Sequence, residues 1–234
     1  MVDSNRQMES TLAIPSQVPV MTLRDTVFFP HSVIPLYIFE PRYREMLEDV
    51  LQGNRMFALA KEDGVQAEVD GSFEPMHRFA TVGIVRASHK NDDGTSNLVL
   101  QGLVRVRIVD IVEENPYRIA EIEPVSSEPG AAEEALMEEK SRVAHLLSKD
   151  RSWQEELPEE FVELIQNIDE PEVFLDLTIH SVCQSAELRQ ELLETLDVYA
   201  RYQRFCHYLD QRIDQQVLYR LLQGPLQDDE IGNN

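Results

Sequence analysis

The sequence predicts an α+β fold in which a β-rich part with one helix precedes an all-helical part. Up to residue 128, short apolar runs alternate with proline and glycine, as in short strands joined by turns. From Ala131 the composition shifts to Ala, Glu, Leu and Gln, and apolar residues recur at helical spacing. The pair Pro129-Gly130 separates the two regimes. We therefore predict a β-rich lobe at 1–128, a helical lobe at 129–224 and a polar tail at 225–234.

The first strands are predicted at Val18–Leu23, Val33–Phe39 and Met56–Ala60, because each is a short apolar run and prolines punctuate this region. Between the second and third runs, Pro41 and Gly53 bracket a stretch with apolar residues at i, i+3, i+4, i+7 and i+8. Proline at a first helical position and glycine just past the end are typical of a helix. One helix therefore interrupts the strands.

A long hairpin is predicted next, from strands at Thr81–His89 and Asn97–Asp110. The turn cluster between them contains Gly94, which we expect at positive φ. Gly102 is expected to mark a bulge or sharp bend, because the apolar alternation shifts phase there. A last strand at Tyr117–Glu123 closes the β region.

Helical spacing and prolines near helix starts predict the second part. The predicted helices are Ala132–Leu147, Pro158–Ile168, Glu170–Ser185, Glu187–Glu194 and Val198–Leu222. Asp197 is a candidate N-cap for the last one. This helix carries a continuous apolar stripe of Tyr202, Phe205, Leu209, Ile213, Val217 and Leu221. We expect the stripe to pack on neighbouring helices, with a partner helix as the alternative.

Composition narrows the class of protein. The 234 residues contain 43 acidic and 21 basic side chains, a net charge of −22 that disfavours nucleic acid and anionic membranes as partners. The two cysteines lie in predicted helices, so a disulfide framework is not expected. The sequence has neither an apolar run long enough to span a bilayer nor the apolar centre of a signal peptide at its start. We expect a cytoplasmic protein.

Catalytic motifs are missing from the sequence. A P-loop needs glycine followed by lysine, and none of the four lysines follows a glycine. The segment Gly94–Leu98 lacks the second glycine of a nucleophile elbow. Paired carboxylates are too numerous for any pair to be singled out for acid/base chemistry. We therefore predict no catalytic residues, no cofactor and no enzymatic activity.

One constellation resembles a zinc site. His180 and Cys183 are spaced i, i+3, and Cys206-His207 could add two ligands. Adjacent residues on a helix point about 100° apart, so Cys206 and His207 converge poorly, and buried cysteine is commonly a small hydrophobe. We expect core packing and no metal.

Arg105 and Arg107 lie two apart on a predicted strand and therefore on one face. A structural ion pair is favoured over anion binding, which stays the alternative.

Four residues are candidates for peptide binding. Phe73 and Met76 lie in Glu62–His77, which has neither strand nor helix periodicity and is interpreted as a long loop. Apolar side chains in an acidic loop gain little unless they fold back or meet a partner, and both alternatives stay open. Tyr37 and Phe39 are weaker candidates, because the core of the β part explains them equally well.

Several stretches resemble, in order, the N-terminal domain of Lon proteases. They are Val18–Pro30 with the strand that follows, Val82-Gly83 with the hairpin, Gln101–Val106, Asp169–Asp176 and Arg189–Glu194. The resemblance covers about Val18 to Leu222. It departs at His31, where a small residue is usual after Pro30, and at Glu170, where a small or polar residue commonly precedes Pro171. Neither departure threatens the fold.

The resemblance implies a β-rich lobe of PUA-like pseudo-barrel character followed by a helical lobe that ends in a long helix. In Lon, this region is thought to recognise unfolded or degron-bearing proteins and to help assemble the hexamer, while ATP hydrolysis and Ser/Lys proteolysis reside in later domains. We therefore expect a stand-alone, bacterial-type binding module whose partners are client polypeptides, a protease or itself. The alternatives are a peptidase-related enzyme or a subunit of an ATP-dependent proteolytic system, and an RNA-binding PUA-like protein.

Overall fold

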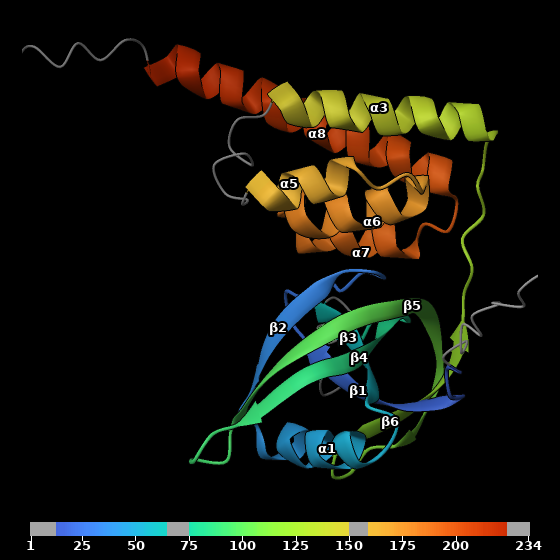
Figure 1. Ribbon diagram of the computed structural model, residues 1–234, viewed down its shortest axis with the longest axis vertical. Helices are drawn as coiled ribbons and strands as arrows, with labels where there is room; N and C mark the ends of the chain where they lie inside the picture. The colour runs from blue at the N-terminus through green and yellow to red at the C-terminus, as the bar shows by residue number, and fades with distance from the viewer. Residues whose placement is uncertain (1–12, 65–74, 150–158, 224–234) are drawn as a thin grey trace, which may run out of the picture.

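The structure is a computed structural model that describes residues 13–64, 75–149 and 159–223. A β layer with one helix lies on one side, and the remaining helices form a second layer across it (Figure 1). The predicted α+β class is confirmed, whereas the PUA-like pseudo-barrel and the lobe boundaries stay predictions. Within the described ranges, no helix combines the length and the apolar character that crossing a membrane requires.

The β layer is one sheet that returns on itself. Its strands are β1 Gln17–Leu23, β2 Val33–Ile38, β3 Met56–Lys61, β4 Phe79–Lys90, β5 Ser96–Glu113 and β6 Arg118–Pro124. Their order is β2-β5-β4-β3-β1-β6, and β6 also pairs with β5. The long strand β5 thus contacts three neighbours, whereas β2 pairs only with β5 among the described strands.

Helix α1, Pro41–Gln52, closes the side of the sheet opposite the helical layer (Figure 1). Its first residue is the predicted proline, and Gly53 caps its end with an N–H to the Asp49 and Val50 carbonyls. The apolar side of α1 packs on the inner face of the sheet, against residues that include Phe28, Phe57 and Leu100. Burial of this stripe fixes the helix, because neither end has a side-chain cap.

Both glycines of the hairpin have the roles that the sequence predicts. Gly94 has φ 82° in the turn between β4 and β5. At Gly102 the pairing of β4 with β5 slips by one residue, and a Cβ there would lie 2.2 Å from the Phe29 carbonyl oxygen. The close approach lets the His31 N–H donate to the Gly102 carbonyl at 3.0 Å. His31 itself has φ 65°, a conformation in which glycine is the least strained residue because it has no Cβ.

The helical layer contains α3 Glu133–Lys149, α5 Glu159–Gln166, α6 Pro171–Val182, α7 Ala186–Glu194 and α8 Val198–Gln223. The predicted helix Glu170–Ser185 is too long, because the Ser185 hydroxyl accepts the Leu188 N–H and begins α7 instead. Asp197 caps α8 as predicted, accepting the Ala200 N–H at 2.8 Å.

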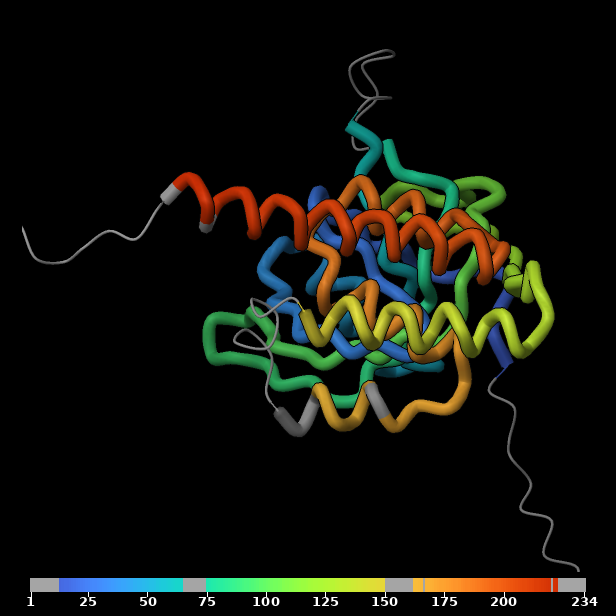
Figure 2. The backbone as a smooth tube through the Cα atoms, turned by 90° about the horizontal axis from the view of Figure 1, so that it is seen from above, coloured from blue at the N-terminus to red at the C-terminus, as the bar shows by residue number. Residues whose placement is uncertain are grey.

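Only the first half of the α8 stripe packs as predicted. Helix α3 runs beside α8 in the same direction, and α8 continues beyond it (Figures 1 and 2). Tyr202, Phe205 and Leu209 are buried, whereas Val217 and Leu221 are 49% and 73% exposed. The expectation that the whole stripe packs on helical neighbours is therefore wrong for these last turns, because α3 ends before it reaches them.

A buried cluster of charges joins the two layers. Arg105 on β5 donates to both carboxylate oxygens of Asp176 on α6 at 3.2 Å, and Arg201 on α8 donates to one of them at 2.7 Å. Glu172 and the Ser127 hydroxyl each accept from both guanidiniums. Burial raises the pKa of the Asp176 carboxyl, and the two guanidiniums oppose that rise. The predicted ion pair of Arg105 is confirmed, while Arg107 forms an exposed pair with Glu123.

A histidine packs into the same interface. His180 on α6 lies edge-on to Phe28 and Phe29, with ring centroids 6.1 and 6.5 Å apart. Burial, with the nearby charge of Arg189, lowers the pKa of His180 to about 4, although a hydrogen bond to the Val27 backbone opposes this. His180 is therefore neutral at physiological pH.

Replacing Arg105 by glutamine is expected to lower the free energy of unfolding by about 3–5 kcal/mol, because Asp176 and Glu172 lose a partner inside the protein. The matched control is Arg107→Gln on the same strand, whose exposed pair should contribute no more than about 1 kcal/mol. Urea denaturation monitored by circular dichroism measures both. Similar losses in the two variants would contradict a special role for the buried cluster.

Stability is also expected to fall as the pH drops from 6.5 toward about 4. In that interval the unfolded chain binds a proton at His180 that the folded chain does not bind, so the free energy of unfolding decreases by up to about 3 kcal/mol. Above pH 6.5 this contribution is fully present. Urea midpoints at pH 7, 5.5 and 4 for the wild type and His180→Gln test it. If the urea midpoints of the wild type and of His180→Gln fall by the same amount between pH 7 and pH 4, His180 is not the group that causes the loss of stability.

Candidate functional site

Tyr37 and Phe39 form an exposed aromatic pair at the end of β2. Their side chains are 52% and 59% exposed, and their rings stack with centroids 6.0 Å apart at an angle of 26°. The strand alternates strictly, so that Ile38 between them is buried while both aromatic rings face solvent. The alternative that the core explains these two residues is therefore wrong. Large exposed apolar groups placed together are typical of an interaction surface.

An apolar groove begins at Tyr37 and crosses the free end of the sheet. It encloses about 450 Å³ and is formed by the neighbouring ends of β2, β5 and β4. Its lining residues are Pro35, Leu36, Tyr37, Ala87, Ser88, His89, Asn97, Leu98 and Val99. None of these is acidic, although the chain has about twice as many acidic as basic residues. The groove thus interrupts an acidic surface with an apolar one.

The structure does not bring Met76 to this groove. Residues at the two described ends of the predicted loop pair with each other, and Glu62 forms an isolated antiparallel bridge to Met76. Met76 is half-buried and packs against the cluster that contains Val18, Ala60 and Val82. Met76 has therefore folded back on the β layer, as one of the two alternatives predicted. Phe73 lies outside the described residues.

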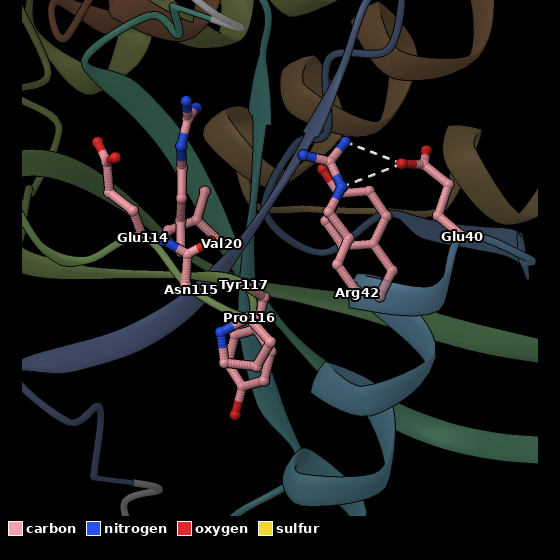
Figure 3. A pocket seen from close by; sticks show the side chains of 9 residues that line it. Val20, Glu40, Arg42, Glu114, Asn115, Pro116 and Tyr117 are labelled. Carbon is pink, nitrogen blue, oxygen red and sulfur yellow. Dashed lines mark hydrogen bonds and ion pairs between the residues drawn. The ribbon is translucent and has the colours of Figure 1, made fainter.

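A second, polar cleft was not found from the sequence. It encloses about 460 Å³ between the start of α1 and the turn from β5 to β6 (Figure 3). Arg42 lies over the Tyr43 ring and pairs with Glu40 at 2.9 Å, while Glu114 and Asn115 lie on the opposite side. Tyr117 donates to Asp49 at 2.7 Å, and burial together with Asp49 raises the pKa of Tyr117 to about 12. The only sequence signals for this cleft are two prolines, Pro41 and Pro116.

The zinc-like residues are dispersed. His180 faces the two phenylalanines, whereas His207 contacts Gln211 on the exposed side of α8. Cys206 lies beside Glu139, and burial raises the pKa of its thiol to about 12. Burial also raises the pKa of Cys183. Among the described residues, no three histidine, cysteine or acidic side chains gather in a metal-binding group, and both thiols are protonated and shielded from reagents.

The fold is that of Lon N-terminal domains. The N-terminal domain of the Mycobacterium avium complex Lon protease has a TM-score of 0.64 at 16% identity, over 83% of this chain and 98% of that one. A Lon N-terminal domain protein from Xanthomonas campestris has a TM-score of 0.59 at 18% identity, over 83% and 99%. At these identities the likeness establishes the fold alone.

Residues 17–211 match the family described as the ATP-dependent protease La (LON) substrate-binding domain, and the chain belongs to this family. The Lon protease of Dictyoglomus thermophilum is 30% identical over 211 residues, which are 89% of this chain and 26% of that protein. The Lon protease of Desulfosudis oleivorans is 27% identical over 94% of this chain and 27% of its own length. The chain thus spans about a quarter of these relatives.

Proposed function

We propose that this chain is a non-enzymatic module that binds exposed apolar segments of unfolded or degron-bearing polypeptides in the cytoplasm. The observation that carries the proposal is the stacked Tyr37–Phe39 pair at the rim of an apolar groove without acidic residues. Family membership supports it, since the matched domain is described as substrate-binding. A folded partner such as a protease, or a second copy, would compete for the same surface.

The groove suits an unfolded client because its apolar parts are already exposed and need no rearrangement. Tyr37 and Phe39 offer large contact areas with few rotatable bonds, so ordering them on binding costs little entropy. Strand β2, which carries Tyr37 and ends immediately before Phe39, is held by six register pairs with β5. The aromatic pair is thus presented on a fixed support, and a polypeptide gains contact area without deforming the sheet.

Removing the aromatic pair is expected to weaken client binding. The double variant Tyr37→Ser, Phe39→Ser should lower the affinity for an unfolded, casein-like protein at least about tenfold, since truncated aromatic anchors dominate binding energies. The matched control is Tyr219→Ser on α8, whose ring is 66% exposed and distant along the chain. Fluorescence anisotropy with labelled client measures all three proteins.

Two results would contradict the proposal. An equal loss in the Tyr219 control would show that any exposed aromatic residue binds the client without a defined site. The absence of a complex between the wild type and every one of several unfolded clients would remove the proposed function itself. Unchanged stability of the double variant, checked by urea denaturation, is expected because both rings are outside the core.

Peptidase and ATPase assays on the pure protein are expected to give background rates. Tyr117 and the thiols of Cys183 and Cys206 are held in their protonated forms, which are weak nucleophiles. His180 is buried against Phe28 and Phe29, and its lowered pKa of about 4 makes it a weak base. Turnover of a fluorogenic peptide or of ATP that scales with protein concentration and survives repurification would overturn the non-enzymatic assignment.

A further inference from the structure

The outer face of β2, β5 and β4 changes chemical character from one strand to the next. The strand register aligns the side chains of this face in three rows across the strands. The rows are Val33, Gln101 and Ile84; then Pro35, Val99 and Ala87; then Tyr37, Asn97 and His89. Arg86 lies at the bulge of β4 between the first two rows, where its side chain bonds to Gln101. The β2 side of the face is therefore apolar, and the β4 side carries the basic side chains of Arg86 and His89.

The positive charge of Arg86 is not compensated by an acid. Its Nε donates at 2.6 Å to the side-chain oxygen of Gln101, which is a neutral amide. Within the described part of the chain, Arg86 forms no ion pair. Both Arg86 and His89 are exposed. The neighbouring Lys90 differs, because it pairs with Glu48 at 2.6 Å. A cation thus borders the groove at its β4 side.

The edge of β2 does not favour addition of a further strand. The Gly102 N–H donates to the Ser32 carbonyl at 2.9 Å, so Ser32, Ile34 and Leu36 turn their backbone groups toward β5. The intervening residues turn theirs to the open edge, and the central one is Pro35, which has no N–H. The backbone hydrogen bonds between β2 and an added strand would therefore lack a donor at the middle of the edge. Recognition therefore falls to the side chains of the outer face.

The strand spacing sets the length of a segment that could use the whole face. Neighbouring strands lie about 4.8 Å apart, so β2 and β4 are separated by about 10 Å across β5. An extended chain advances about 3.3 Å per residue. Arg86 is also offset from Pro35 by up to about 7 Å along the strands, so the diagonal between the two is about 12 Å. In an extended chain, residues i and i+4 are about 13 Å apart and lie on the same face, whereas i and i+3 lie on opposite faces. A segment that crosses the strands diagonally therefore presents residues i and i+4 to the apolar side and the cationic side.

We infer that the groove selects extended segments in which an aromatic or aliphatic residue is followed or preceded, four positions away, by an acidic residue. The apolar side chain packs against Tyr37 and Pro35, and the carboxylate pairs with Arg86. This inference rests on the proposed function and adds the chemistry of the preferred client. It holds despite the net charge of −22, because at physiological salt distant charges are screened within about 8 Å while Arg86 acts at contact.

The test uses short, capped, glycine- and serine-rich peptides that contain Phe-Gly-Ser-Gly-Asp or Phe-Gly-Ser-Gly-Asn. Their binding is followed by NMR through the backbone amides of Ala87 and Val99. The Asp peptide is expected to bind about twofold to fivefold more tightly than the Asn peptide, the range of an exposed ion pair. A peptide with Phe and Asp adjacent should lose this advantage, and added salt should diminish it.

The variants separate charge from shape. Arg86→Gln should abolish the preference for the Asp peptide, and Arg86→Lys should retain it. Arg107→Gln, an exposed arginine at the other end of β5, is the control that should leave the preference intact. Equal binding of the Asp and Asn peptides, or no peptide binding beside intact binding of an unfolded client, overturns the inference and leaves the proposed function standing. Loss of client binding as well overturns both.

Discussion

The pairing of two buried guanidiniums with Asp176 is the constraint on which the arrangement of the layers depends. Arg105 comes from the sheet and Arg201 from the last helix, and both are almost completely removed from water. Such groups cost several kcal/mol to bury and recover this only when every partner is in place. The cluster therefore tolerates one position of α6 and α8 over β5. It acts less as a source of net stability than as a device that fixes orientation.

Fixing the helices over one side of the sheet leaves the other parts of the sheet open. The helical layer covers the region around Phe28, Phe29 and Arg105, while α1 covers the opposite side. The neighbouring ends of β2, β4 and β5 lie beside α1 and away from the helical layer (Figure 1). The exposed rings of Tyr37 and Phe39 are thus a result of how the layers are held apart, and the proposed binding surface follows from the architecture rather than from a dedicated loop.

Local signals predicted the elements well, and long-range pairing limited what could be predicted of the site. Pro41, Gly94, Gly102 and Asp197 act through their own backbone neighbourhood, so their roles could be inferred from the sequence. The pairing of β2 with β5 joins segments that are far apart in the chain, and without it Tyr37 has no groove. Arg201 looked like any other arginine of an amphipathic helix, because burial depends on partners that are far away in the chain. For the same reason the sequence left two alternatives open for Met76, whose burial depends on the cluster that contains Val18 and Val82.

Among the described strands, β2 pairs along one side only, with β5. A strand with one neighbour is the part of a sheet that frays most readily, since its opening breaks only one ladder. A ligand that reaches from β2 to β4 would bridge that ladder from outside and hold the strand closed. Occupancy of the groove would then slow the hydrogen exchange of the backbone amides along β2. A bound polypeptide would in this way stabilise the strand on which it lies.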